Sequence, residues 1–143
     1  MSTAATVNPT YRNPPGALHA ILLGGTVTLF LGALLSDIAY HQSYQNQWSN
    51  FSSWLLAGAE VFCGLVLVFA LVGLLRASHK RGQPLTYFLL VLATFVLGLV
   101  NCFQHAKDAW AVMPGGLVLS IIVFILACVT AWMGLSVRAG GVK

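Results

Sequence analysis

The sequence predicts an all-α integral membrane protein, folded as an antiparallel four-helix bundle. Composition is the first ground, because 58% of the residues are hydrophobic and only 7% are charged, whereas soluble domains carry about a quarter charged residues. The mean hydropathy of +0.84 is the second. The third is that four apolar runs reach the roughly 20 residues that a helix needs to cross the hydrocarbon core. We expect one domain over residues 1–143, with spans at about 17–40, 53–75, 85–103 and 116–136.

The first expected span combines packing residues with an acid. It carries small residues at helical spacing, Gly25, Thr28, Gly32 and Ser36. Such stripes let helices approach closely in lipid. Near its end stand Asp37 and His41, four residues apart and therefore on one helical face. Asp37 needs a partner, because an unpaired carboxylate is expensive at membrane depth.

The second expected span begins after a polar segment. Residues 41–50 are rich in Gln, Asn and Ser, and we expect a loop there, flanked by the aromatic residues of an interfacial belt. Glu60 follows about two turns inside the span. Two interpretations of Glu60 stay open, a hydrogen-bonded residue that holds helices together and a functional group. The three cysteines are dispersed, which favours small buried hydrophobic residues.

The last two spans are joined by the most chemically varied stretch of the chain, residues 104–114. It contains a His, a Lys, an Asp, a Trp and a Met between two long apolar runs. Pro114 then suits the first turn of the fourth span. The short connection over residues 76–84 makes the second and third spans antiparallel neighbours.

The basic residues predict the orientation of the bundle, since Lys and Arg in short loops stay on the cytoplasmic side. Six of the seven fall on one side: Arg12, Arg76, Lys80, Arg81, Arg138 and Lys143. Only Lys107 falls on the other. We therefore predict a multi-pass protein of the cell inner membrane, with both termini cytoplasmic and residues 104–114 outside. Nucleic acid is not an expected partner, because the basic residues are dispersed and line no aromatic groove.

Several segments resemble the bacterial membrane family catalogued as domain of unknown function 2231. They are LHAILLGG, LFLGALLSDIAY, QWSNFSSWLLAG, NCFQHAKDAWAVMPGGLVLS and AWMGLSVRAGGV, which together extend over almost the whole chain. The family-like positions are His19, Asp37, Trp48, Trp54, Asn101, His105, Asp108, Trp110 and Pro114. The resemblance implies a four-span inner-membrane protein, of a subgroup often encoded beside periplasmic quinoprotein sugar dehydrogenases. It suggests a redox partner.

Two departures from the family concern haem. Many members carry a His at the start of the third span, where this chain has residues 85–88 without one, and the usual C-terminal His is missing from residues 138–142. From the residues themselves, His19 and His41 lie about 33 Å apart along one helix and cannot share a haem. His41 and His105 share the outer level, so they are the candidate ligands of a haem b. We expect no cofactor, with haem b as the alternative.

No enzyme motif is present: the sequence lacks a nucleophile elbow, a phosphate loop, a dinucleotide fingerprint, CxxC and HExxH. Three functions stay open. The first is an accessory or anchor subunit that presents a polar outer face to a periplasmic dehydrogenase or a larger membrane complex, and a homo-oligomer is compatible with it. The second is a haem protein that passes electrons to quinone. The third is a small transporter or proton path through Asp37 and Glu60.

The first function makes a structural prediction. We expect one polar cluster at the outer end of the bundle, formed by Asp37, His41, Glu60, Asn101, His105, Lys107, Asp108, Trp110 and Met113. Within it, Asp37 or Glu60 should bind His41, His105 or Lys107. Trp110 and Met113 would supply apolar contact to the partner, because aromatic and Met residues are enriched at interface centres.

Overall fold

The computed structural model describes residues 16–77 and 82–139, which are almost entirely helical and contain no strand. Five helices follow one another: α1 Ala17–Ser43, α2 Asn46–Arg76, α3 Gln83–His105, the one-turn α4 Ala109–Val112 and α5 Gly115–Ala139. All but α4 are long and apolar enough to cross a membrane, α5 over Gly115–Ser136. The predicted all-α class with four spans is confirmed.

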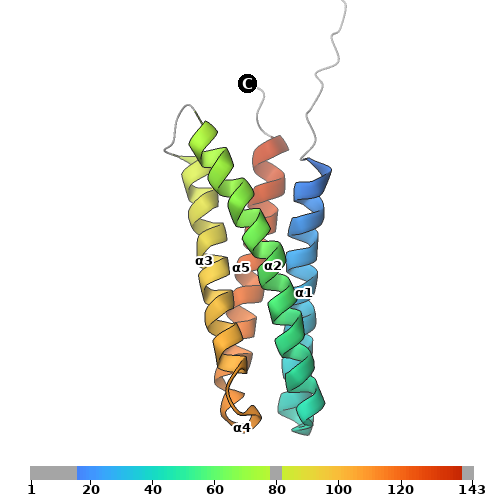
Figure 1. The fold of residues 1–143 in the computed structure, drawn as a ribbon. Helices are drawn as coiled ribbons and strands as arrows, with labels where there is room; N and C mark the ends of the chain where they lie inside the picture. The colour runs from blue at the N-terminus through green and yellow to red at the C-terminus, as the bar shows by residue number, and fades with distance from the viewer. Residues whose placement is uncertain (1–15, 78–81, 140–143) are drawn as a thin grey trace, which may run out of the picture.

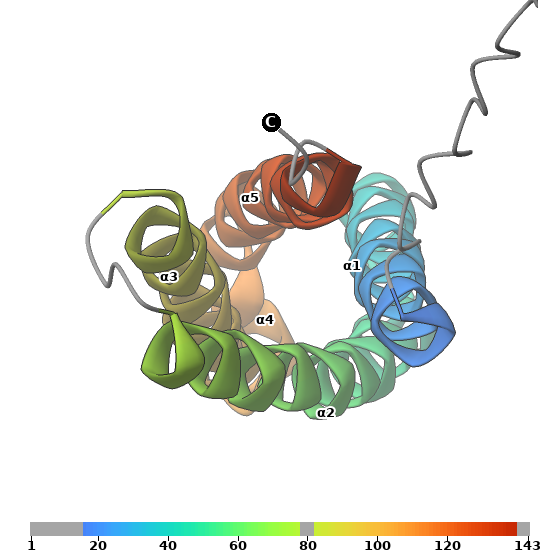
Figure 2. The same ribbon diagram turned by 90° about the horizontal axis from the view of Figure 1, so that it is seen from above.

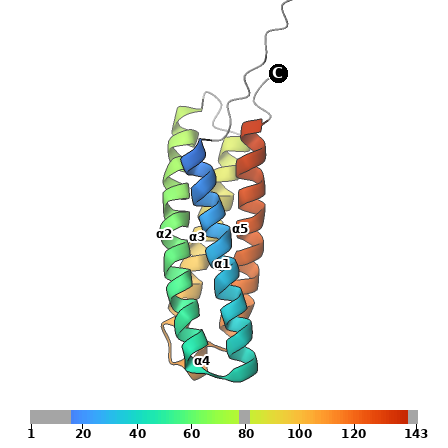
Figure 3. The ribbon, with the colours of Figure 1, turned by 90° about the vertical axis from the view of Figure 1, so that its right-hand side faces the viewer.

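The four long helices form an antiparallel ring, seen from the side in Figure 1 and along its axis in Figure 2. Each packs against the next in sequence, and α5 closes the ring on α1. Figure 3 shows α1 between α2 and α5. The start of α1 and the end of α5 lie at one end of the bundle, and α4 lies at the other. We call these the opposite end and the α4 end.

The junction between α1 and α2 is shorter than the sequence predicts. The expected loop over residues 41–50 is wrong, because α1 continues to Ser43 and α2 begins at Asn46. Tyr44 ends α1 in a left-handed conformation, with φ 51°, and its backbone N–H donates to the carbonyl oxygen of Tyr40 at 2.7 Å. A helix satisfies its own backbone groups, so at the membrane boundary these polar residues extend the helices.

Glycines bring α1 close to α2. A Cβ atom added to Gly25 would lie 2.5 Å from the Phe62 ring, and one added to Gly32 would lie 3.1 Å from Leu55. The predicted stripe of small residues therefore meets α2 at both glycines, while Thr28 is exposed. Close van der Waals contact of this kind drives helix association in lipid, where apolar burial gives little incentive.

The inward face of α3 is unusually polar. Its buried residues recur every three or four positions and are Val91, Thr94, Gly98, Asn101 and His105. The hydroxyl groups of Thr94 and of Thr130 on α5 are hydrogen bonded at 3.0 Å inside the bundle. The exposed side of α3 carries large apolar residues, among them Leu89, Val96, Val100 and Phe103. This helix thus turns its apolar side to lipid and its polar side to its neighbours.

The orientation of the bundle stays a prediction. Four of the basic residues on which it rests, Arg12, Lys80, Arg81 and Lys143, lie outside the described residues. Arg76 ends α2 at the opposite end, and Lys107 follows α3 at the α4 end. The two basic residues therefore fall on different sides, as the predicted topology requires.

Candidate functional site

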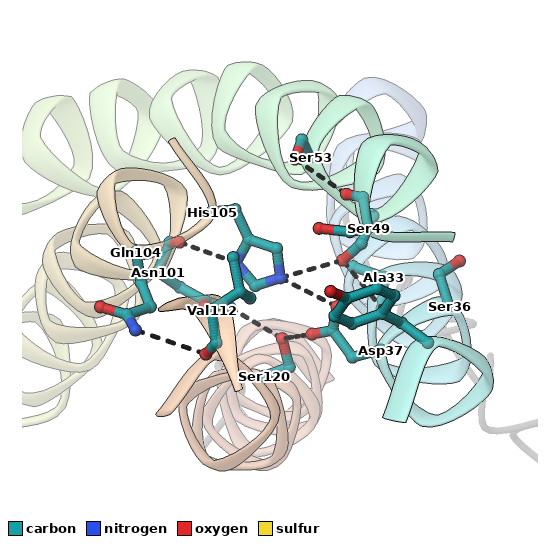
Figure 4. Close-up of polar contacts among 12 residues, drawn as sticks. Ala33, Ser36, Asp37, Ser49, Ser53, Asn101, Gln104, His105, Val112 and Ser120 are labelled. Carbon is teal, nitrogen blue, oxygen red and sulfur yellow. Dashed lines mark hydrogen bonds and ion pairs between the residues drawn. The ribbon is translucent and has the colours of Figure 1, made fainter. Parts of the chain in front are cut away.

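Four helices bring polar side chains to one level inside the α4 end, where Figure 4 shows them converging. We call this set the Asp37 network, and it consists of Asp37 from α1, Ser52 from α2, Asn101 and His105 from α3, and Ser120 from α5. All five residues are buried. They meet because α1 and α3 end at this level, whereas α2 and α5 begin there.

The carboxylate of Asp37 is the centre of this network. Its Oδ1 lies 2.8 Å from Nε2 of His105, and its Oδ2 accepts a hydrogen bond from the Ser120 hydroxyl. Asn101 in turn donates from Nδ2 to the Ser120 oxygen at 2.8 Å. Asp37 is 0% exposed, so its carboxyl group has no access to water. The partner that the sequence required for Asp37 is therefore supplied by α3 and α5 together.

The geometry limits where protons can reside on His105. Its Nδ1 lies 3.0 Å from the carbonyl oxygen of Asn101. A carbonyl only accepts, so Nδ1 must carry a hydrogen. One further proton lies between Nε2 and Asp37, giving either an imidazolium and a carboxylate or a neutral imidazole and a carboxylic acid. The pair has no net charge in either arrangement, which suits a buried site.

Ser52 gives this site a superficial likeness to a hydrolytic triad. Its Oγ lies 3.4 Å from Nε2 of His105 and donates to the carbonyl oxygen of Ala33 at 3.3 Å. In a triad the carboxylate binds one ring nitrogen and the serine the other. Here Asp37 and Ser52 both meet Nε2. The arrangement therefore does not activate Ser52 as a nucleophile, and it ties α2 to α1 and α3.

A second set of hydrogen bonds fixes the connection between α3 and α5. Tyr40 donates its hydroxyl hydrogen to the carbonyl oxygen of Ala109 at 2.9 Å. Gln104 donates from Nε2 to the carbonyl oxygens of Ala111 at 3.1 Å and Val112 at 3.3 Å. Val112 is 0% exposed and fills the space beneath α4. These contacts hold α4 against the bundle from two sides.

Aromatic residues stand on the outer surface of this fixed segment. Trp110 on α4 is 71% exposed, and its ring stacks on that of Tyr44 with centroids 5.9 Å apart and planes 16° apart. Tyr44 belongs to the α1–α2 junction. The stack therefore joins the two connections at the α4 end, and both rings remain exposed.

Four other residues of the predicted cluster lie at the α4 end but outside the Asp37 network. His41, Lys107 and Asp108 are exposed at the α4 end, and Met113 is half-buried. Lys107 donates from Nζ to Oε1 of Gln104 at 2.6 Å. None of these four side chains joins the Asp37 network among the contacts of the described residues.

Glu60 lies deeper in the bundle than the prediction placed it, and no hydrogen bond of the described residues joins it to the other members of the cluster. Glu60 lies in the middle of α2, and its carboxyl group contacts the backbone of α3 at Gly98, with Phe30 of α1 beside it. Gly98 precedes His105 by seven residues, or about 10 Å of helix. The depth of Glu60 was counted from the predicted start of the second span at residue 53. Because α2 begins at Asn46, seven residues earlier, that count placed the carboxyl group too near the surface.

His19 is at the opposite end of the bundle. Its Nε2 lies 3.0 Å from the hydroxyl oxygen of Tyr87 on α3, and its ring meets that of Phe69 on α2 edge-on. These residues border a cavity of about 180 Å³, together with Pro84 and Gly134. His19 therefore belongs to a separate contact between α1, α2 and α3.

The candidate haem ligands have different surroundings. The His105 side chain is buried, and both ring nitrogens have hydrogen-bond partners. His41 is exposed, with its ring 6.3 Å from that of Tyr44. Coordination of iron by His105 would require one of its hydrogen bonds to break. The residues present therefore do not form a ready haem site in this arrangement.

Four residues of the site were not predicted: Tyr40, Ser52, Gln104 and Ser120. Each stands within or beside an apolar run, where a lone hydroxyl or amide is compatible with either packing or hydrogen bonding. Ser52 and Ser120 could have been found by asking which polar side chains share the depth of Asp37. Tyr40 could have been found from its position one turn after Asp37.

Comparison with known families agrees with this architecture. The model of the family described as "Predicted membrane protein (DUF2231)" matches residues 15–140. A search of the curated proteins gave no significant match, and neither did a search of the solved structures.

Proposed function

This chain belongs to the DUF2231 family of predicted membrane proteins, and we propose that it is a small accessory or anchor subunit of the inner membrane. In this proposal the α4 end docks a protein partner. The partner is a periplasmic redox enzyme or a larger membrane complex, and the four spans hold the docking surface at the membrane face.

The observation that carries the proposal is the Trp110–Tyr44 stack on an immobilised segment. A large aromatic ring gives most binding energy when it is held in place before the partner arrives, because less conformational entropy is then lost. The Tyr40 and Gln104 hydrogen bonds supply that preorganisation from below. The Asp37 network fixes the ends of α1 and α3 from which these side chains extend.

Polar residues lie next to the segment that carries the stack and could form part of an interface rim. A shallow depression beside α4 is lined by Asn46, Ser49, Asn50, Ser53, His105, Lys107 and Ala109. Its amides, hydroxyls and ammonium group can hydrogen bond to carbonyl and carboxylate groups of a partner. An apolar centre with a hydrogen-bonding rim is the usual anatomy of a protein interface.

Exposed aromatic residues also occur in membrane proteins as interfacial belts that contact lipid headgroups. Trp132, near the opposite end, is 78% exposed and serves as the comparison for Trp110. It lies on the lipid-facing side of α5 and no described residue stacks on it. Trp110 and Trp132 are therefore matched in size and exposure, and they differ in the stack on Tyr44 and the polar depression beside Ala109.

The test is co-purification from native membranes. A tagged chain is extracted in mild detergent, and the proteins recovered with it are quantified for wild type, Trp110→Ala, Asp108→Ala and Trp132→Ala. Loss of an interface hot spot costs at least about 2 kcal/mol, which is more than a tenfold loss of affinity. We expect that loss for Trp110→Ala, a smaller one for Asp108→Ala, and none for Trp132→Ala.

Stability measurements separate docking from folding. Asp108→Ala should change the free energy of unfolding by no more than about 0.5 kcal/mol, the usual range for surface substitutions. Trp110→Ala also loses its stack on Tyr44 and should cost about 0.5–1.5 kcal/mol. If the Trp110 and Asp108 variants retain every partner at the wild-type level, the docking role is wrong. Equal losses for Trp110→Ala and Trp132→Ala would assign both rings to lipid contact instead.

A further inference from the structure

Glu60 is a buried acid that the Asp37 network leaves aside. It lies in the middle of α2 and is 7% exposed. Its carboxyl group points across the bundle to α3, where an added methyl group on Gly98 would overlap it. The absence of a side chain at Gly98 therefore makes the room that the carboxyl group occupies.

Two buried acceptors in this region lack a donor. Neither carboxyl oxygen of Glu60 has a hydrogen-bond partner among the described residues, and the same holds for Oδ1 of Asn101. Asn101 is 0% exposed and follows Gly98 by three residues, so it lies about one helical turn further toward the α4 end on the same inward face. Both groups thus belong to one stretch of the bundle interior.

The chemistry of these two groups identifies what is missing. An ionised carboxylate and an amide oxygen are both acceptors, so they cannot satisfy each other. An ionised carboxylate without a partner is also strongly disfavoured within a span. A single proton resolves both problems, because a carboxylic acid can donate a hydrogen bond to an amide oxygen.

The surrounding groups do not replace that proton. The thiols of Cys63 on α2 and Cys102 on α3 are within electrostatic range of Glu60 and carry no positive charge. Asp37 from α1 and His105 from α3 form a pair that is already compensated. From α5 the nearby polar group of the network is the hydroxyl of Ser120, which is bonded to Asp37 and Asn101. No described cation reaches Glu60.

We propose that Glu60 and Asn101 form a proton-binding site in the interior of the bundle. The carboxyl group of Glu60 holds the proton at neutral pH and donates it to Oδ1 of Asn101, and Gly98 keeps the space between α2 and α3 open for it. The site is separate from the docking surface and does not depend on a partner.

The first test uses dicyclohexylcarbodiimide, an apolar reagent that partitions into membranes. A protonated carboxyl group adds to one C=N bond: its oxygen bonds to the central carbon, its proton goes to a nitrogen, and acyl transfer to nitrogen leaves a stable acylurea. In wild-type protein at neutral pH we expect one adduct, located at Glu60 by peptide mass spectrometry. It should decrease as pH rises and be absent from Glu60→Gln.

Asp37 is the internal control for this experiment. It is more deeply buried than Glu60 but is bonded to His105 and Ser120, so we expect no adduct there. Labelling of both acids would mean that the reagent reports burial alone, and the proposal fails. The labelling can also be repeated with added sodium chloride or choline chloride at fixed pH. If sodium chloride alone protects Glu60 from the reagent, the site binds a metal cation and the proton-site proposal is wrong.

Infrared spectroscopy tests the same site without a reagent. Wild-type protein at neutral pH should show the carbonyl stretch of a protonated carboxylic acid, and Glu60→Gln should lose the part of this band that belongs to Glu60. Asn101→Leu should move the band to higher frequency, because the acid loses its acceptor. If the wild-type spectrum contains no such band at neutral pH, Glu60 is ionised and the proposal is wrong, whether or not the Asn101 variant folds.

Discussion

Replacing Asp37 by alanine tests how strongly the buried network holds the bundle together. Alanine leaves His105 and Ser120 buried without the carboxylate that both contact. Two lost hydrogen bonds between membrane helices would amount to only about 1 kcal/mol. Removing one member of a buried charge pair costs about 3–5 kcal/mol, since the other is left uncompensated. We expect a loss of about 3 kcal/mol, at the lower end of that range, because His105 can become neutral.

Asparagine at the same position is the matched variant. Its amide nitrogen can donate to Nε2 of a neutral His105, whose Nδ1 keeps its hydrogen for the Asn101 carbonyl. Its oxygen can still accept from Ser120. Only the charge assistance is lost, which is worth about 1 kcal/mol. Asp37→Asn should therefore be clearly more stable than Asp37→Ala.

The assay is equilibrium unfolding in mixed micelles with a rising fraction of sodium dodecyl sulfate, followed by circular dichroism. Asp108→Ala removes an exposed carboxylate and serves as the control, with an expected change within about 0.5 kcal/mol. Equal losses for Asp37→Asn and Asp37→Ala would show that charge, rather than the hydrogen-bond pattern, stabilises this end. Wild-type stability for both would refute the reasoning altogether.

Three further predictions concern the topology, the haem hypothesis and the space at Gly98. In a variant without native cysteines, a membrane-impermeant thiol reagent should label intact cells at Lys107→Cys but not at Lys80→Cys; the reverse pattern would overturn the orientation. Purified protein should show no Soret band, and a band lost in His105→Ala would favour the electron carrier. Gly98→Ala should destabilise by about 1–3 kcal/mol through overlap with Glu60, measured by the same unfolding assay. Gly24→Ala, where an added Cβ meets nothing within 4 Å, should be neutral or stabilising.

The sequence was sufficient for the architecture because lipid imposes simple rules. A span must be long and apolar, and its backbone groups must form hydrogen bonds within the span. Composition and the lengths of the apolar runs therefore predicted four helices. The same rules say little about where polar helices end outside the hydrocarbon. For that reason the segment over residues 41–50 was predicted as a loop, although α1 and α2 occupy most of it.

The site was predicted in part. Asp37, Asn101 and His105 were correctly placed together, because an acid at membrane depth needs a partner and the antiparallel order brings these residues to one level. The missing information was the rotation of each helix about its axis. Without it, Ser120 could not be distinguished from a packing residue. Glu60 was placed too near the surface for another reason, because α2 begins seven residues before the predicted start.

The Asp37–His105 bond also has a consequence for how the protein is made. Its two residues are 68 positions apart, and Ser120 is 83 positions from Asp37. When α1 and α2 have entered the membrane, Asp37 still has neither partner. An ionised residue costs about 2.5–3.5 kcal/mol at the centre of a span on insertion scales and less toward its end, where Asp37 lies. That cost persists until α3 and α5 arrive. A chain interrupted after α2 therefore leaves Asp37 unpaired within the membrane, whereas the finished bundle pairs and buries it.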